Sequence, residues 1–126
     1  MQLTQGLHRA VQQKPDAVAT VCGNRVRTFR ELHDRVAQLA SGMREIGVRQ
    51  GDRVGILALN SDRYLEAYLA IAWLGAVVSP VNFRWSPAEI IYSLKDSECS
   101  ALFIDDTFAP HAPALRCRPE RRLTVR

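Results

Sequence analysis

Apolar residues recur at helical spacing over residues 29–46 of this 126-residue chain. Their separations alternate between 3 and 4, which places them on one face of a helix: Phe29, Leu32, Val36, Leu39, Met43 and Ile46. Thr28 and Glu31 have the spacing of a capping box, and Gly47 can adopt the left-handed conformation that ends many helices. The pattern predicts a long amphipathic helix between Thr28 and Gly47.

The residues before this helix predict a shorter helix and a β-hairpin. Thr4 can cap a helix that carries Leu7, Ala10 and Val11 on one face and ends before Pro15. Residues 17–22 and 25–28 then form two short strands, joined at Gly23-Asn24, two residues that tolerate the positive φ of a tight turn.

Two further helices follow, each marked by a capping serine. Ser61 begins the first, whose expected buried side is Tyr64, Leu65, Tyr68, Leu69, Ala72 and Trp73, and Gly75 ends it. Ser86-Pro87-Ala88-Glu89 begins the second with a cap, a proline at the first helical position and a capping glutamate, and Ile90, Ile91 and Leu94 point inward.

Short apolar strands separate these helices at residues 53–59, 76–80 and 101–105. The strand at 76–80 is short and uncharged, so it is expected to be buried on both faces. The order strand, helix, strand, helix, strand predicts a parallel βαβαβ unit over about 53–105. The fold class is therefore α/β, with a partial layered sheet preceded by a helix, a hairpin and a long amphipathic helix.

The end of the chain differs in composition from the rest. Residues 1–110 hold 12 basic and 12 acidic side chains, so the net charge of +4 comes from five arginines after residue 115 set against the single acid Glu120. We expect residues 1–110 to form the domain, with a weak helix over 107–115 and the start of a strand at 123–125. Residues 111–126 are then a basic, proline-containing tail that is cut short within an element.

Composition excludes several classes of protein. No aromatic platform or recognition helix accompanies the arginines, which argues against nucleic-acid binding. No apolar run approaches the ~20 residues of a membrane span. Cys22, Cys99 and Cys117 are widely spaced, and the first amino acids form no apolar signal segment, so we expect reduced thiols in a cytoplasmic protein, with Cys22 and Cys99 in the core.

The sequence offers no catalytic residue and no metal site that we would assign. No glycine-rich phosphate-binding motif is present, and His8, His33 and His111 lie far apart, with His33-Asp34 expected to face solvent. Asp105-Asp106 follows a strand, where acids either hold Mg²⁺ or cap the next helix.

The two tryptophans are assigned structural roles. Trp73 is expected in the core, and Trp85 is expected to stack on the guanidinium of Arg84.

The motifs resemble one family when they are read in order over about residues 3–108. T-F-R-E-L, G-V-R-Q-G-D-R-V-G-I-L, the run from Asn60 to Arg84 that contains S-P-V-N-F-R, and S-P-A-E-I-I-Y-S-L-K-D-S-E-C-S-A-L-F-I-D-D are similar to successive passages of the adenylate-forming acyl-CoA synthetases. The similarity points to the fatty-acyl and aryl-acid CoA ligases. It implies that this chain is an incomplete N-terminal lobe of an AMP-binding domain.

The resemblance also implies the chemistry of a longer parent protein. Such enzymes join a carboxylic acid to ATP, with Mg²⁺, and pass the acyl group to CoA. Their lysine-ended phosphate loop and other ATP-binding residues lie downstream of the segment matched here. The chain alone is therefore expected to be inactive and to bind no cofactor.

Asn82 and Arg84 are the two positions with a possible role in the parent. The resemblance places them at the edge of the CoA tunnel, where a basic residue could meet a CoA phosphate. The alternative is structural: Asn82 satisfies backbone groups of its loop, and Arg84 pairs with an acid of the parent.

A different reading of the whole chain is a self-contained small α/β binding or regulatory module without catalysis. That module needs a sheet covered on both faces, whereas three predicted strands offer little area to cover the apolar helices. We therefore expect exposed apolar surface and self-association of the isolated chain.

Overall fold

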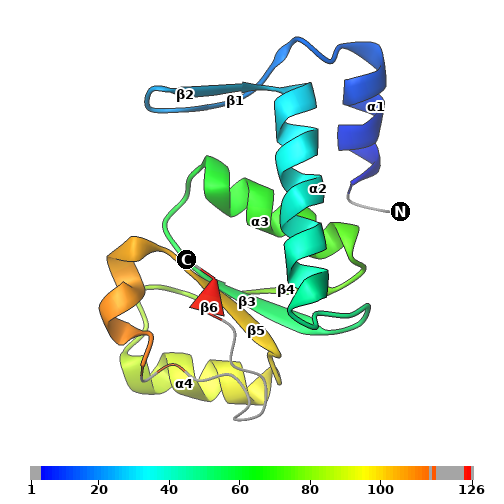
Figure 1. Cartoon of the computed structure of the whole chain (residues 1–126). Coiled ribbons are helices and arrows are strands. Elements are labelled where there is room, and N and C mark those ends of the chain that lie inside the picture. The colour runs from blue at the N-terminus through cyan, green and yellow to red at the C-terminus, as the bar shows by residue number, and fades with distance from the viewer. Residues whose placement is uncertain (1–3, 114, 116–123, 126) are drawn as a thin grey trace.

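The computed structural model describes residues 4–113, 115, 124 and 125. Along the chain its elements are α1 (Gln5–Gln13), β1 (Val18–Cys22), β2 (Arg25–Thr28), α2 (Phe29–Glu45), β3 (Arg53–Leu57), α3 (Asp62–Trp73), β4 (Val77–Pro80), α4 (Pro87–Asp96), β5 (Ala101–Ile104), the 3₁₀ helix η1 (Asp106–His111) and β6 (Thr124–Val125). The predicted order of helices and strands is confirmed, and the chain is α/β (Figure 1).

The main sheet is parallel, as predicted. Its strand order is β4-β3-β5-β6, and β3 pairs in parallel with both β4 and β5. The start of a strand expected at 123–125 is confirmed for Thr124–Val125, which pairs with β5, whereas Leu123 lies outside the described residues. The β1–β2 hairpin forms a separate two-stranded sheet.

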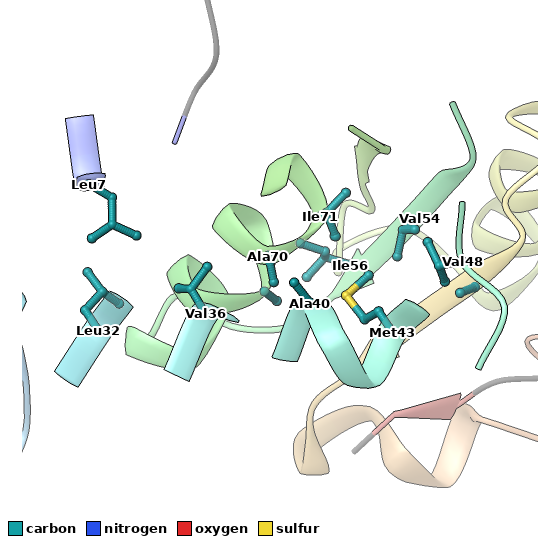
Figure 2. Close-up of a cluster of buried hydrophobic side chains, with 12 residues drawn as sticks. Leu7, Leu32, Val36, Ala40, Met43, Val48, Val54, Ile56, Ala70 and Ile71 are labelled. Atoms are coloured by element: carbon teal, nitrogen blue, oxygen red, sulfur yellow. The ribbon is translucent and has the colours of Figure 1, made fainter. Parts of the chain in front are cut away.

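Helices cover both faces of the main sheet. In Figure 1, α2 and α3 lie on one side of the strands and α4 lies on the other. The first apolar core joins α1, α2, α3 and β3, and Figure 2 shows side chains of α2 meeting those of α3 and β3, among them Ala40, Met43, Ala70, Ile71 and Ile56. The second core joins α4, β5 and residues after η1.

Gly55 allows α4 to approach the middle strand closely. A Cβ atom at this position would lie 2.9 Å from Leu102 Cδ1 and 3.2 Å from Leu94 Cδ2. A larger residue would force the ends of these two leucine side chains to move, so the glycine favours the close packing seen here.

The predicted helix signals are largely confirmed. Capping boxes are present at Thr28 and Ser86, and the Ser61 hydroxyl accepts a hydrogen bond from the Tyr64 amide. Gly47 and Gly75 follow their helices with φ of 99° and 72°. These local signals act within a single turn, which is why the sequence reveals them.

Two local predictions are wrong. Thr4 does not cap α1 with its side chain, because its own φ and ψ of −80° and −7° are already helical. The helix expected over 107–115 is instead a 3₁₀ helix at Asp106–His111, which contains Pro110, a residue without the N–H that an α-helical turn uses.

The strands around α3 also differ from expectation. β3 ends at Leu57 rather than residue 59. β4 is an edge strand of the described sheet, and Val77 is 49% exposed, so the prediction of burial on both faces is wrong. An apolar run indicates that a strand packs on something, but it does not give the position of that strand in the sheet.

The predicted buried side of α3 is right only in part. Tyr64, Tyr68, Leu69 and Trp73 are partly buried against the first core, whereas Leu65 is 40% exposed. The fully buried residues of the helix are Asp62, Glu66, Ala67, Ala70 and Ile71. Trp73, expected in the core, is half-buried at its margin. None of the helices in the described part of the chain has the length and apolar character that a membrane crossing demands.

Candidate functional site at the carboxyl edge of the sheet

The carboxyl ends of β3, β4 and β5 meet at one edge of the parallel sheet. The Val81 amide donates to the Ile56 carbonyl at 2.9 Å, and the Asp105 amide donates to the Leu57 carbonyl at 3.2 Å. Open α/β sheets bind ligands at this edge because the loops that follow the strands converge there. The loops here begin at residues 58, 81 and 105.

Asp105 links two of these loops. Its Oδ2 accepts a hydrogen bond from the Leu59 amide at 2.8 Å, and its Oδ1 accepts one from the Thr107 amide at 2.9 Å. The second bond caps η1, so the capping interpretation of Asp105-Asp106 is confirmed. In the described residues, no group of three or more His, Cys, Asp or Glu side chains could hold a metal ion.

Asn82 shapes the loop after β4. Its Oδ1 accepts a hydrogen bond from the Arg84 amide at 3.0 Å, and its carbonyl accepts one from the Trp85 amide at 3.1 Å. The side chain therefore satisfies a backbone group of its own loop, as the structural interpretation of this residue requires.

Arg84 is exposed on the same loop. Its Cζ lies 5.8 Å from the ring centroid of Phe83, so the predicted stacking on Trp85 is wrong. Phe83 in turn contacts Phe108 of η1, with ring centroids 5.9 Å apart. The loop thus presents a guanidinium next to an aromatic pair, which could contact an anion; its role at a CoA tunnel stays a prediction.

Two buried acids and three more exposed arginines meet between the hairpin and the helices. We call this group the arginine–acid cluster: Arg25, Arg27, Arg35, Asp62 and Glu66. Arg25 binds Asp62 through two hydrogen bonds, of 2.9 Å from Nε and 2.6 Å from Nη2. Arg35 binds Glu66 in the same bidentate manner, at 2.8 and 3.0 Å. Arg27 Nε lies 3.5 Å from Glu66 Oε1 and 3.9 Å from Asp62 Oδ2.

These contacts change the acidity of the groups involved. The hydrogen bonds from the Arg25 guanidinium hold the pKa of Asp62 below its usual range, against the opposing effect of burial. The hydrogen bond to Glu66 raises the pKa of Arg35 further above its already high value. Asp62 is therefore ionised near neutral pH, and its ion pair with Arg25 fixes the hairpin to α3.

Sequence analysis missed this cluster, although its signal is present. Arg25 and Arg27 are two residues apart, so they share one face of a strand, and Asp62 and Glu66 are four apart, so they share one face of a helix. Two complementary faces of opposite charge could have been paired on this basis.

The histidines and cysteines form no reactive centre in the described residues. His33 Nδ1 lies 3.4 Å from Asp34 Oδ1, and the His33 ring also contacts the rings of His8 and Trp73. The prediction that this pair faces solvent is therefore only partly right for His33. Cys99 is buried, as predicted, whereas Cys22 is only half-buried beside Arg25. Cys117 and the arginines after residue 115 lie outside the described residues.

Comparison with known proteins gives a consistent result. The family model described as "AMP-binding enzyme" matches residues 7–125. The chain is 46% identical over 105 residues to a 2-succinylbenzoate–CoA ligase of Arabidopsis thaliana, which covers 83% of this chain and 19% of that protein. It is 41% identical over 107 residues to a feruloyl-CoA synthase of an Amycolatopsis species, which covers 85% of this chain and 22% of that protein.

The fold agrees with these sequence matches. A crystal structure described as a long-chain-fatty-acid CoA ligase from Rhodopseudomonas palustris superposes with a TM-score of 0.88 and 28% identity. The superposition covers all of this chain and 33% of that one. This chain thus spans about a fifth of the length of the curated relatives it matches.

Proposed function

The chain belongs to the AMP-binding enzyme family, the adenylate-forming acid–CoA ligases, and from this premise we propose that it serves as the N-terminal part of an ATP-dependent acid–CoA ligase. The parent activity would join a carboxylic acid to AMP and then transfer the acyl group to the CoA thiol. The observation that carries this proposal is the family match over residues 7–125 together with identity above 40% to two CoA-ester-forming relatives.

The proposed substrate class is a carboxylic acid, with no finer choice between fatty and aromatic acids. Relatives named for both kinds of acid match the chain: the feruloyl-CoA synthase described above, and a long-chain-fatty-acid–CoA ligase of Thermus thermophilus that is 42% identical over 89 residues. We also propose that the protein is located in the cytoplasm.

ATP and Mg²⁺ would be held by parts of the parent other than this chain. A triphosphate needs several backbone amides and a cation around it. The described residues form no cluster of metal ligands, and both oxygens of Asp105, the acid that follows β5, already accept backbone hydrogen bonds. We therefore propose that the 126-residue chain alone does not form an adenylate.

Arg84 would contribute to CoA binding in the parent. The side chain is exposed on a loop held in shape by Asn82, and an arginine can pair with a phosphate through two N–H groups. In an active ligase that contains this segment, Arg84→Ala is expected to raise the KM for CoA with little change in the KM for ATP.

Two measurements test the proposal. The purified 126-residue chain should give no ATP–pyrophosphate exchange with a panel of fatty and aromatic acids. A chimera, in which this chain replaces the matching segment of the Arabidopsis ligase, should form the adenylate of that enzyme's substrate. Exchange by the isolated chain would refute its predicted inactivity, and a wild-type chimera that fails to form adenylate would refute the assignment to the parent.

A further inference from the structure

Asp105 joins two of the three loops at the carboxyl edge of the sheet. Its Oδ1 accepts a hydrogen bond from the Thr107 amide at 2.9 Å, which caps η1. Its Oδ2 accepts a second hydrogen bond from the Leu59 amide at 2.8 Å, across 46 positions of sequence. A helix cap needs only the first of these bonds. The second bond ties the loop after β3 to η1, so the Asp105 side chain connects segments that are distant in sequence.

The backbone of Asp105 holds η1 in place against the sheet. The Asp105 amide donates to the Leu57 carbonyl at 3.2 Å, and the Asp105 carbonyl accepts from the Phe108 amide at 3.1 Å. Phe108 itself is partly buried against the second apolar core. The Phe108 ring is therefore positioned both by the core beneath it and by the hydrogen bonds of Asp105.

Phe108 in turn supports the loop after β4. Its ring centroid lies 5.9 Å from that of Phe83, and Arg84 Cζ lies 5.8 Å from the Phe83 centroid. The backbone of Arg84 is set by its own loop, because its amide donates to Asn82 Oδ1. The guanidinium group, by contrast, lies beside the Phe83 ring, and the place of that ring depends on Phe108.

We propose that Asp105 is a positioning residue of the parent ligase, which places the Arg84 guanidinium for a CoA phosphate. It acts through the contact between Phe108 and Phe83. The inference rests on the proposed function, because it specifies how the loop that would meet CoA is held. In this arrangement Asp105 joins the loops after β3 and β5, and the two rings join the loop after β5 to the loop after β4.

A role in capping alone is the alternative, and asparagine separates the two roles. Asparagine caps helices about as well as aspartate, so Asp105→Asn can keep the bond from Thr107. Its amide has one acceptor oxygen, and the NH₂ group would meet the Leu59 N–H as a second donor, so the link between the loops is lost. Asp105→Ala loses both bonds. Capping alone predicts that Asn behaves like the wild type, whereas positioning predicts that Asn behaves like Ala.

Steady-state kinetics of the chimera with the Arabidopsis ligase provide the main test. Asp105→Asn should raise the KM for CoA roughly 3- to 10-fold, because one hydrogen bond that supports the loop is lost. The KM for ATP and the kcat should change less than about 2-fold, since the loss concerns CoA binding rather than adenylate formation. Asp106→Asn is the matched control. It removes the same charge from the neighbouring, exposed residue of η1, and all three constants should stay unchanged.

A double-mutant cycle shows whether Asp105 acts through the aromatic rings. Phe108→Leu keeps an apolar side chain against the second core but removes the ring that contacts Phe83. Combined with Asp105→Asn, it should raise the KM for CoA no further than the stronger single variant, because both break the same support. Single effects that multiply would show that Asp105 acts by another route, and the proposal would be wrong.

The 126-residue chain offers a check that needs no activity. Exchange of the Leu59 amide hydrogen with solvent should be at least about 3-fold faster in Asp105→Asn, whereas exchange at Thr107 should change little. Unchanged exchange at Leu59 would show that the bond between the two loops does not restrain them, and the proposal would fail.

The outcomes separate this inference from the proposed function. An active wild-type chimera in which Asp105→Asn leaves the KM for CoA unchanged, or raises both KM values alike, overturns the positioning role alone. If Arg84→Ala leaves the KM for CoA unchanged, the loop does not meet CoA, and the positioning role is wrong although the ligase assignment stands. A wild-type chimera that forms no adenylate refutes both proposals.

Discussion

Asp62 holds the hairpin against the helices more directly than any apolar residue of β1 or β2. Its carboxylate, with a side chain only 1% exposed, accepts two hydrogen bonds from Arg25 and faces Arg27. On the outer side of the hairpin, Val18, Val21 and Val26 are exposed, so apolar burial contributes little to its docking. At the scale of single residues, ion pairs with a buried carboxylate add to the apolar contact that Ala19 makes with the first core.

Asp62→Asn is expected to lower the free energy of unfolding by about 2 kcal/mol, because a neutral amide cannot pair with two guanidinium groups in a buried position. Urea titration at pH 7 measures the change. Asp34→Asn serves as the control, since the Asp34 side chain is 65% exposed and its Oδ1 lies 3.4 Å from His33 Nδ1. Equal effects of the two substitutions would contradict the special role of Asp62.

The acidity of Asp62 gives a pH dependence with a definite sign. Hydrogen bonds from Arg25 lower the pKa of Asp62 in the folded state, and hydrogen bonds with Thr28 lower the pKa of Glu31. A group with a lowered folded pKa stabilises the protein above its unfolded pKa, about 4 for these carboxyls, and that contribution is lost as the pH falls through the folded value.

The wild-type chain should therefore lose stability as the pH is lowered below about 4, and Asp62→Asn should lose less over the same interval. Denaturant unfolding at several pH values between 7 and 3 tests this. Parallel profiles of the two proteins would show that Asp62 does not titrate as described.

At the scale of elements, boundaries follow from local signals and orientations do not. The caps at Thr28, Ser61 and Ser86 were all predicted, because each involves residues within one helical turn. The burial of Asp62 and Glu66 in α3 was not predicted. Apolar residues are spread around this helix, and the two acids are turned inward by their hydrogen bonds with Arg25 of β2 and Arg35 of α2. The edge position of β4 was missed for a related reason, since strand order is not a local property.

Replacing glycine by alanine at two sites of α2 and its end should change the free energy of unfolding in opposite directions. Gly47 has φ of 99°, and a Cβ there would meet no atom within 4 Å, so Gly47→Ala should cost about 1 kcal/mol from backbone conformation alone. Gly42 lies inside α2 with similar open space, and Gly42→Ala should stabilise by about 0.5–1 kcal/mol. Thermal unfolding of both variants checks the signs; a neutral or stabilising Gly47→Ala would contradict the left-handed helix end.

At the scale of the whole molecule, several apolar side chains of the described residues remain exposed. They lie on the hairpin, α3, β4, the loop after β4 and α4, and include Val21, Leu65, Val77, Trp85 and Tyr92. This surface is in keeping with a segment of a larger protein, whereas a self-contained module would be expected to cover it. The arginines after residue 115 do not enter this comparison, because they lie outside the described residues.

Self-association of the isolated chain therefore stays a prediction, now with specific residues. The purified protein should bind the dye ANS, and its apparent mass should rise weakly with concentration up to hundreds of micromolar in sedimentation experiments. Leu65→Lys should reduce the dye signal. A monodisperse, cooperatively unfolding monomer that ignores ANS would instead favour the self-contained module.

The sequence by itself determined the order of the elements, the caps at Thr28, Ser61 and Ser86, the parallel βαβαβ unit and the family. These depend on periodicity, on residues within one turn of each other, and on motifs in a fixed order, all of which can be read along the chain. Only the tertiary structure decided which side of α3 is buried, that Asp62 and Glu66 meet three arginines, and that β4 is an edge strand. Each of these depends on which distant segments come together, because burial and pairing are properties of neighbours in space rather than of neighbours in sequence.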